Sequence, residues 1–445
     1  MKNIAIIGAG LTGLTTAFYL KKNGFGVTVY ENTHRCGGAI HSFEEKGFIF
    51  ESGPNTGVLG NPEVAELFED LGCTDLIDIA DSRAKKRLIW KKGKWHALPS
   101  GPISAITTPL FTFKDKINVL FEPFRKKGDD LHESLANLVR RRLGKSFLDY
   151  AIDPFIGGIY SGNPDKLIPK YALPKLYNLE QDHGSFIKGA IAKKKELKSD
   201  RDKKATKEVF SVKGGLERLV GELVLAIGVE NIFVGAPVSI HKEDNQYIVN
   251  NDVYDYVVTT CNSKPLPELL SFADKSKLKI IDSVKYAAVA QVTMAFSDWD
   301  GDDIFAFGGL IPTKEKKDIL GILFTSSFFK NRAPENGVLL SIFVGGTRKE
   351  HLFDLSEQEI IDLANKEVKA MLKPKEAKQE FVKVFKHKYA IPQYEVSSKE
   401  RFEAIYQLQK ENKGLIIGGN IINGIGMADR IKQGRDIAEK ITKDI

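Results

Sequence analysis

Residues 2–31, KNIAIIGAGLTGLTTAFYLKKNGFGVTVYE, decide the fold of this chain. Residues 4–7 form a short apolar run that suits a buried parallel strand. Gly8, Gly10 and Gly13 follow at once in the spacing G-x-G-x-x-G, and a helix is expected from there to about residue 23. A second strand over 27–30 ends at Glu31. This order of strand, glycine turn, helix, strand and acid predicts a β-α-β unit that binds a dinucleotide.

Each glycine has its own task in such a unit. Gly8 permits a tight turn, Gly10 lets the backbone approach a pyrophosphate, and Gly13 lets the helix pack close to the strand. Leu11 and Thr12 begin the helix, whose N-terminus points free N–H groups and a positive dipole end at the phosphates. The alternative, an ordinary glycine-rich turn between a strand and a helix, does not require the complete order of elements.

The residues after the second strand indicate which dinucleotide binds. Glu31 is placed to accept hydrogen bonds from a ribose diol, and its charge argues against a 2′-phosphate, which leaves NAD or FAD. The segment ENTHRCGGAIHS then places Arg35, Gly37 and Gly38 just beyond this acid. It resembles the R-x-G-G loop of the flavin amine oxidase and desaturase superfamily, in which the glycines let the backbone pass the FAD pyrophosphate and the arginine adds positive charge.

This resemblance implies FAD as the cofactor, with Gly53, Pro54 and Val238 as further cofactor contacts. The superfamily usually has a basic residue after the glycine pair, whereas this chain has Ala39, so one phosphate contact lacks its usual partner. Histidine and cysteine side chains lie in the same loop, but the flavin already accounts for that loop. No metal site is therefore expected.

The C-terminal stretch GLIIGGNIINGIGMADRIKQGRDIAEKI supplies an independent second half of the cofactor site. Residues 415–417 read as a short apolar strand, which Gly419 and Asn420 interrupt. Gly426 and Met427 belong to a second close-approach turn, and a helix follows whose N-terminus could stabilise negative charge on a reduced flavin ring. The alternatives are a plain C-terminal βα unit and an NAD site, and an NAD site would not explain glycine-rich turns at both ends of the chain.

Composition excludes several classes of protein. The 445 residues are 42% hydrophobic, so they can bury a large core, yet no apolar run reaches the roughly 18–20 residues that span a bilayer. The first apolar run is short and belongs to a strand, so no signal peptide is expected, and three cysteines without C-x-x-C spacing fit a reducing, cytoplasmic location. Net charge is +7, but basic residues are interspersed with acids, which argues against nucleic-acid binding. The densest basic run, 193–207, is interpreted as a solvated segment, with a lipid-facing patch as the alternative.

The predicted fold class is α/β, with a discontinuous Rossmann-like FAD-binding lobe, a second lobe built on a mixed β-sheet for the substrate, and a mostly helical lobe. The FAD-binding lobe is assigned to residues 1–84, 201–285 and 395–445. Residues 85–200 form the helical lobe, which faces substrate or membrane, and residues 286–394 form the substrate-binding sheet.

Four segments in the middle of the chain are not needed by flavin sites in general. They are residues 151–191, with PFIGGIYSGNP, residues 305–312, with FAFGGLIP, residues 321–346, with SSFFKNRAP, and residues 387–396, with AIPQY. Together with the two flavin segments they resemble the protoporphyrinogen oxidases and coproporphyrinogen III oxidases of haem biosynthesis over nearly the whole chain. The resemblance implies FAD-dependent, oxygen-dependent six-electron oxidation of a porphyrinogen to a porphyrin. Which of the two porphyrinogens is the substrate stays open.

The resemblance also implies site residues and partners. Phe343 matches an aromatic ring that stacks on one pyrrole, Leu310 and Leu323 match two aliphatic residues that sandwich another, and Phe307 and Gly158 match further pocket positions. The alternative for the alternating Leu310, Leu323 and Phe343 is plain core of the second sheet. The flavin does the redox chemistry, so no catalytic side chain is assigned, dioxygen reoxidises the flavin, and a downstream chelatase is a candidate recipient of the product.

Two further features concern the helical lobe. Some relatives carry an arginine shortly after an L-P-x-G turn to hold a propionate, but here the matching position is Ile103, so the carboxylate partner is unassigned. Residues 103–124 are apolar and aromatic and precede Arg125, Lys126 and Lys127. They suggest either a peripheral contact with the inner face of the plasma membrane or a lining for the substrate slot. The rival functions are a flavin amine oxidase or carotenoid-type desaturase, and a non-enzymatic FAD-binding scaffold.

Overall fold

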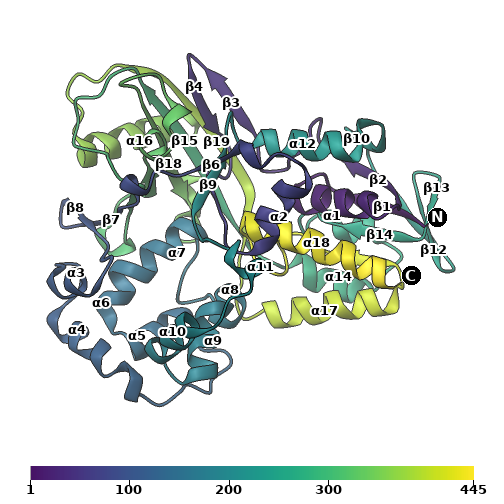
Figure 1. Ribbon diagram of the computed structural model, residues 1–445, viewed down its shortest axis with the longest axis horizontal. Helices are drawn as coiled ribbons and strands as arrows, with labels where there is room; N and C mark the ends of the chain where they lie inside the picture. The colour runs from purple at the N-terminus through teal and green to yellow at the C-terminus, as the bar shows by residue number, and fades with distance from the viewer. Residues whose placement is uncertain (1, 445) are drawn as a thin grey trace.

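The computed structural model describes residues 2–444 (Figure 1). Five parallel strands form one sheet in the order β10-β2-β1-β14-β20. Their bounds are Asn3–Ile7 for β1, Gly26–Glu31 for β2, Ile232–Val234 for β10, Tyr256–Thr259 for β14 and Leu415–Ile417 for β20. The strands come from three separated parts of the chain, so the Rossmann-like lobe is discontinuous, as the sequence predicts.

Helices cover both faces of this sheet because successive side chains of a strand point to opposite sides. Ile4 and Ile6 of β1 join a core with α1 (Leu11–Lys22), α12 (Glu217–Ile227) and α18 (Met427–Lys443). Residues 5 and 7 join the other core, with α14 (Lys275–Asp282) and α17 (Ser398–Glu411). Gly434 lets α18 lie against α1, because a Cβ there would be 2.7 Å from the carbonyl oxygen of Thr12.

A second, mixed sheet has seven strands in the order β19-β15-β18-β17-β16-β7-β8. Only β16 and β7 run parallel. The bounds are Arg87–Lys91 for β7, Lys94–Ala97 for β8, Tyr286–Phe296 for β15, Gly308–Leu310 for β16, Ile319–Leu323 for β17, Val338–Gly345 for β18 and Gln379–Pro392 for β19. Helix α16 (Glu357–Leu372) covers one face and starts at a capping box, in which Ser356 and Glu359 bond each other's backbone N–H.

The helical lobe lies below the second sheet in Figure 1. Its main helices are α3 (Pro102–Thr107), α4 (Phe113–Leu120), α5 (Leu135–Arg142), α7 (Asp153–Ile159), α8 (Pro169–Ala172), α9 (Pro174–His183) and α10 (Phe186–Lys195). The predicted start of this lobe at residue 85 is too early, because β7 and β8 extend the second sheet. The pairing of β7 with β16 joins segments more than 200 residues apart, which local sequence patterns do not show. The remaining domain boundaries stay a proposal.

Smaller elements connect the three lobes. The hairpin β3 (Ser42–Glu45) and β4 (Phe48–Glu51) and the small sheet β5 (Gly57–Val58), β9 (Val209–Val212) and β6 (Ile77–Ile79) lie between the two large sheets, and β11 (Ile240–Glu243), β12 (Gln246–Val249) and β13 (Asp252–Tyr254) form a separate antiparallel sheet. Helix α2 (Pro62–Asp70) packs against α18, and α11 (Asp200–Lys203) contacts α2. In the described part of the chain, no helix has the length and apolar character needed to cross a membrane.

Candidate active site

The first glycine turn lies at the carboxyl end of β1, where ligands of parallel sheets bind. Gly8 has φ of 108°, which favours glycine, and a Cβ on Gly13 would lie 2.0 Å from the carbonyl oxygen of Gly8. Gly10 differs from both, because a Cβ there would meet no protein atom within 4 Å. The protein's own packing therefore explains Gly8 and Gly13, whereas Gly10 leaves open the space that a pyrophosphate would occupy.

The R-x-G-G loop lies directly against this turn. The N–H of Gly37 donates to the carbonyl of Ala9 at 2.8 Å, and a Cβ on Gly38 would lie 3.3 Å from Gly10 Cα. Arg35 donates to the carbonyls of Cys36, Gly38 and Ile40 at 3.1, 2.7 and 2.7 Å. The sequence predicts added positive charge at this position, and the structure gives the same guanidinium a second task, which is to fix the shape of the loop.

Glu31 ends β2 with its carboxylate held in place. One carboxylate oxygen accepts from the N–H of Ala9 at 2.9 Å, and the other accepts from the N–H and hydroxyl of Thr33, both at 2.8 Å. The backbone of Glu31 also accepts from Ala236 at 3.1 Å, which brings the segment with the half-buried Val238 beside it. The acid is therefore oriented before any ribose binds.

The C-terminal turn meets the N-terminal one across two residues that follow β14. A Cβ on Gly8 would lie 2.9 Å from the hydroxyl of Thr260, and one on Gly419 would lie 2.8 Å from the carbonyl of Thr260. Sequence reasoning missed Thr260 and Cys261, although their place after a buried strand at the ligand edge of the sheet was a usable signal. Gly53, which precedes Pro54, also belongs here, because a Cβ on it would lie 2.1 Å from the carbonyl of Ala39.

Gly426 and Met427 start α18 at this same turn. The N–H of Gly426 donates to the carboxylate of Asp429 at 3.1 Å, and Met427 is buried. Together these turns, the fixed acid and the open space at Gly10 fit FAD. When bound, FAD accepts electrons from the substrate, and the residues described here bind and orient it.

The candidate substrate residues occupy one face of the second sheet. Leu310 pairs with Gly321, Leu323 with Ser341, and Phe343 with both Gly321 and Gln291, so all of them point to the same side. Leu310, Leu323 and Phe343 are half-buried, whereas their neighbours Ile322 and Ile342 point to the other side and are fully buried in the core with α16. Leu323 and Phe343 do not match the alternative of plain sheet core, whereas Leu310 also packs against a small core cluster that includes Ile89 and Tyr150.

Gly158 joins this face from α7, and Phe307 lies at its end. A Cβ on Gly158 would lie 2.5 Å from Leu310 Cδ2, so glycine is what allows the helix to approach the leucine. The Phe307 ring stacks on Phe328 at 4.4 Å between centroids, and the guanidinium carbon of Arg87 lies 5.7 Å from its centroid. Phe307 therefore packs with a separate aromatic cluster, while its backbone leads directly into β16.

A buried polar network connects the cofactor side to this face. Ser341 donates its hydroxyl to the side-chain oxygen of Asn55 at 2.9 Å, and the Asn55 amide donates to the carbonyl of Gly53 at 3.1 Å. The amide of Gln291 donates to the carbonyl of Glu51 at 2.6 Å. Sequence reasoning missed these side chains, although Gln291 and Ser341 are polar residues inside otherwise apolar β-type runs, which was a usable signal.

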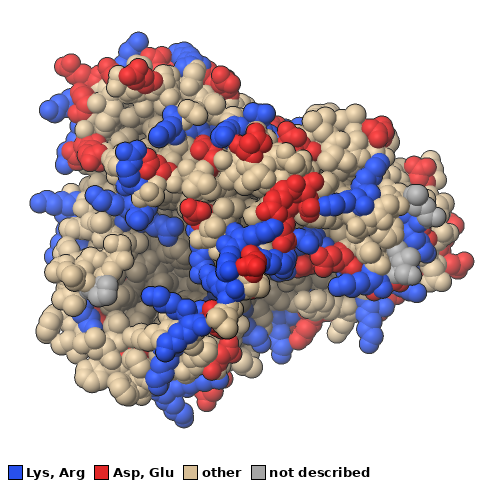
Figure 2. All heavy atoms as spheres, viewed as in Figure 1, with Lys and Arg blue, Asp and Glu red and all other residues tan. Residues whose placement is uncertain are grey.

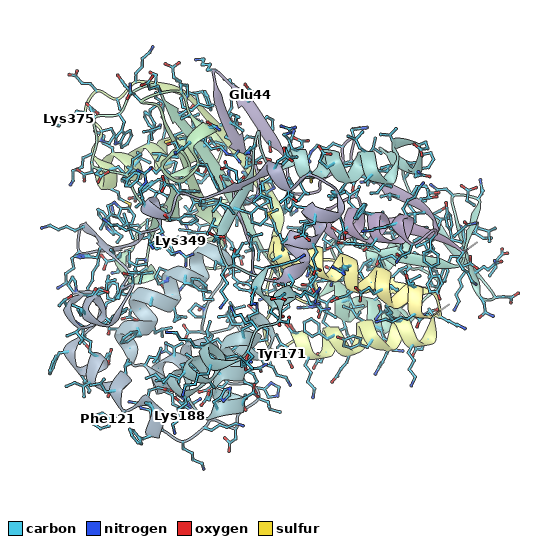
Figure 3. The ribbon with its side chains drawn as sticks, viewed as in Figure 1. Glu44, Phe121, Tyr171, Lys188, Lys349 and Lys375 are labelled. Carbon is cyan, nitrogen blue, oxygen red and sulfur yellow. The ribbon has the colours of Figure 1, made fainter. Side chains whose placement is uncertain are left out.

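Figure 2 shows a hollow between the sheet lobe and the helical lobe, with Lys and Arg side chains on its rim. Lys349 and Lys188, labelled in Figure 3, lie on opposite sides of it in this view. Arg348, whose guanidinium pairs with Asp153, would lie 4.0 Å from a Cβ on Gly157. Ile103, by contrast, is exposed on α3 and offers no charge for a carboxylate.

The outer surface of the helical lobe exposes large apolar side chains, and few charges appear there in Figure 2. The exposed residues are Ile103, Ile106, Phe113, Ile117, Leu120, Phe121 and Phe124, of which Phe124 is 84% exposed. Figure 3 places Phe121 at the outer end of this lobe. We call these residues the α3–α4 apolar surface. Of the two interpretations of residues 103–124, this exposure favours contact with something outside the chain over a lining for the substrate slot.

The basic run 193–207 is exposed along most of its length, as the interpretation as a solvated segment expects, but its end also forms ion pairs. Arg201 pairs with Glu63 at 2.9 Å and with Glu66 at 2.8 Å, and Lys204 pairs with Glu69. These acids lie on α2 of the FAD-binding lobe. The run therefore fastens the end of the helical lobe to the FAD-binding lobe, and sequence reasoning missed this because the paired acids are about 135 residues away.

The chain is similar to known proteins over nearly its full length. Residues 11–442 match the family described as flavin containing amine oxidoreductase. Protoporphyrinogen oxidase 2, chloroplastic/mitochondrial, of Arabidopsis thaliana is 30% identical, covering 99% of this chain and 94% of the relative. Coproporphyrinogen III oxidase of Staphylococcus aureus is 27% identical, covering 100% of both chains.

Solved structures agree on the fold. A crystal structure from Exiguobacterium sp. 255-15, named as a candidate protoporphyrinogen oxidase, gives a TM-score of 0.83 at 23% identity, covering 100% of this chain and 99% of that one. Reduced UDP-galactopyranose mutase gives a TM-score of 0.75 at 15% identity, covering 100% and 96%. At these identities the likeness concerns the fold alone.

Proposed function

This chain belongs to the flavin-containing amine oxidoreductase family, and from that premise we propose that it oxidises a porphyrinogen to a porphyrin in haem biosynthesis, with FAD as the cofactor and dioxygen as the final electron acceptor. Six electrons and six protons leave the macrocycle in three two-electron steps. Three molecules of dioxygen then accept them and become three molecules of hydrogen peroxide.

One observation carries this proposal, namely the apolar face formed by Leu310, Leu323 and Phe343 beside Gly158. A porphyrinogen is a large, mostly apolar macrocycle, which needs a wide apolar surface and a few polar groups at the rim. The half-buried side chains of this face meet that need without disturbing the core behind them. The Ser341–Asn55 hydrogen bond links the face to the turn at Gly53, so substrate and cofactor would lie side by side.

None of the side chains on this face can act as a strong base. The face offers aliphatic, aromatic, amide and hydroxyl groups, and the Asn55 and Ser341 polar atoms are already hydrogen-bonded to each other. The protein's contribution is therefore to orient the macrocycle and exclude water, while the cofactor supplies the redox chemistry. Pyrrole N–H protons would leave to solvent through the hollow.

The direct test is a substrate screen of the FAD-loaded enzyme in air, with porphyrin fluorescence as the readout. Turnover of a porphyrinogen without turnover of primary or secondary amines is the expected result. Turnover of an amine without turnover of either porphyrinogen would establish the rival amine oxidase function. Comparing protoporphyrinogen IX with coproporphyrinogen III in the same assay decides the substrate, because the two differ in the number of carboxylates that the basic rim must hold.

We further propose that the α3–α4 apolar surface makes a peripheral contact with the inner face of the plasma membrane, where anionic lipids lie. The surface is followed by Arg125, Lys126 and Lys127. Arg125 and Lys127 donate to the carbonyls of Arg141 and Gln181, so the exposed Lys126 is the one that would face lipid headgroups while the aromatic rings enter the interface. Sedimentation with anionic liposomes at low salt should deplete the protein from solution. A Phe121→Asp, Phe124→Asp double variant should stay in solution, and equal behaviour of the two proteins would count against the contact.

The product is a poorly soluble macrocycle, so we also propose direct transfer to a chelatase that inserts the metal. When both enzymes are present, the porphyrin should be metallated as it forms. The fluorescence of free porphyrin should then not rise before the metallated product appears. A rise of free-porphyrin fluorescence before the metallated product appears would indicate that the porphyrin is released into solution.

A further inference from the structure

Four arginines of this chain are buried, and they fall into two pairs. Arg142 pairs with Glu122 at 3.1 Å and with Glu180, and Arg332 pairs with Glu51 at 2.9 Å. Arg401 and Arg430 are 1% and 8% exposed, and within residues 2–444 neither forms an ion pair with a carboxylate. A buried charge without a counterion is unfavourable, so these two guanidiniums need a separate explanation.

Both unpaired guanidiniums bind the backbone of the same loop, residues 418–427. Arg401 of α17 donates to the carbonyl of Ile421 at 3.1 Å. Arg430 of α18 donates to the carbonyls of Ile422 and Asn423 at 3.1 and 2.8 Å. Loop 418–427 is the one that carries the candidate flavin contacts Gly419, Asn420, Gly426 and Met427.

Uncharged side chains hold the rest of this loop. Gln433 accepts from the N–H of Gly419 at 2.8 Å and donates to the carbonyl of Ile422 at 3.1 Å. The Tyr394 hydroxyl donates to the carbonyl of Asn420 at 2.8 Å and accepts from the N–H of Gly424 at 3.0 Å. The Gln433 oxygen also accepts from Arg430 Nη1 at 2.6 Å, but the groups that bond the loop here are themselves uncharged. Shape alone therefore does not explain why two positive charges are buried behind it.

The surroundings do little to neutralise the two arginines. The guanidinium carbon of Arg401 lies 5.3 Å from the Tyr394 ring centroid and 5.1 Å from that of Phe402. Asp429 acts on Arg430 only through space, is exposed, and caps Gly426. Half-buried Glu395 acts in the same way on Arg401. The N-terminus of α18 adds a positive dipole end at the same place.

We propose that Arg401 and Arg430 are positioning residues whose buried charge raises the reduction potential of the flavin held by loop 418–427. A flavin that takes up two electrons and one proton carries one net negative charge on its ring, and buried positive charge nearby favours that form over the neutral oxidised one. This inference rests on the proposed function only for the presence of FAD at this loop. Such a shift would help the enzyme take electrons from its substrate.

The test is the midpoint potential of the bound flavin, measured by equilibration with a reference dye in the absence of any porphyrinogen. In Arg430→Gln, the ratio of reduced to oxidised flavin at a fixed potential should fall about tenfold, which is about 30 mV for a two-electron couple. Arg401→Gln should shift the potential in the same direction. Arg430→Lys keeps the charge, so its ratio should stay within about threefold of the unsubstituted enzyme.

Two controls separate charge from structure. Arg435→Gln removes a charge from the same helix that is already paired with Glu66 and Glu439, and it should leave the potential unchanged. Tyr394→Phe removes two uncharged bonds to loop 418–427 without changing charge, and it should not reproduce the shift. A ratio in Arg430→Gln within threefold of the unsubstituted enzyme, at full FAD content, would overturn the proposal, and so would an equal shift in Tyr394→Phe.

If Arg430→Gln fails to bind FAD, the Arg430→Lys variant provides the test. A tenfold fall in its ratio of reduced to oxidised flavin, with the charge retained, would also overturn the proposal. Because no porphyrinogen enters this measurement, a failure of the proposed substrate leaves its result intact. Conversely, an unchanged potential would not affect the substrate screen.

Discussion

The cofactor cradle and the substrate face are built from different parts of the polypeptide. In the cradle, backbone atoms of Gly8, Gly37, Gly53 and Gly419 lie so close to other backbone that a Cβ would collide or nearly collide. On the substrate face, Leu310, Leu323 and Phe343 present side chains from regular strands, and the strands themselves need nothing unusual. A cradle built from backbone tolerates few residue types, whereas a face built from side chains can change its ligand by changing side chains.

The largest combined loss of stability and FAD binding is expected from a substitution at Gly13 in the cofactor cradle, where an added Cβ would disrupt the fold itself. A Cβ in Gly13→Ala would lie 2.0 Å from the carbonyl oxygen of Gly8, and neither backbone segment can move away without separating α1 from β1. We expect a loss of about 3 kcal/mol in the free energy of unfolding, the upper end of what overpacking typically costs, and no retained FAD. Urea denaturation and the flavin absorbance of the purified protein measure both. A stable, yellow Gly13→Ala protein would show that the turn is not under this constraint.

Gly10→Val should weaken FAD binding without weakening the fold. A side chain at this position meets no protein atom at its Cβ, so the apoprotein should keep its free energy of unfolding within about 1 kcal/mol. FAD affinity, measured by titration of the apoprotein, should fall at least about tenfold because the side chain would fill the space for the pyrophosphate. Unchanged FAD affinity would mean that the pyrophosphate lies elsewhere.

Neighbouring residues of β18 should respond in opposite ways. Ile342→Ala removes a fully buried side chain from the core with α16 and should lower the free energy of unfolding by about 2–5 kcal/mol. Phe343→Ala removes a half-buried ring from the other side and should cost about 1 kcal/mol of stability. The same variant should lower kcat/KM for the porphyrinogen by about 10–100-fold, or about 1.4–2.7 kcal/mol of transition-state binding, with FAD content unchanged. Equal activity in Phe343→Ala would place the macrocycle elsewhere.

The smallest effect is expected where the helical lobe is fastened to the FAD-binding lobe. The hydrogen bond from Arg201 lowers the pKa of the Glu66 carboxyl, so the stabilisation is present at neutral pH and is lost as the pH falls through the lowered pKa. Because Arg201 is about half exposed, Arg201→Gln should change the free energy of unfolding by less than about 1 kcal/mol. The difference from the unsubstituted protein should vanish at acidic pH, and a difference that grows at low pH would contradict the assigned pairing.

This contrast also explains which features the sequence could predict. The turn at Gly8, Gly10 and Gly13 was predictable because a backbone constraint leaves a local signature at fixed spacing. The sharing of one face by Leu310, Leu323 and Phe343 depends on strand register, and here the family resemblance supplied what spacing did not. The assignment of these residues to substrate stays a prediction, although the position of Leu323 and Phe343 off the core supports it.

Other features have no local signature. The pairing of β7 with β16, the bond between Ser341 and Asn55, and the ion pairs of Arg201 each join residues that are more than 100 positions apart. The role of Arg35 in fixing its own loop could have been predicted, since its partners lie within five residues, but we expected only added positive charge from it. Arg401 and Arg430 look like ordinary helix residues in sequence, and only their burial without a counterion draws attention to them.

The central claim is that the face of Leu310, Leu323 and Phe343 places a porphyrinogen beside the flavin. The most direct test is anaerobic mixing of the FAD-loaded enzyme with protoporphyrinogen IX or coproporphyrinogen III, followed by the absorbance of the flavin in a stopped-flow instrument. We expect one of them to bleach the flavin within the turnover time, and we expect Phe343→Ala to slow this step by about 10–100-fold. A flavin that stays oxidised with both porphyrinogens, in an enzyme that a chemical reductant bleaches normally, would contradict it.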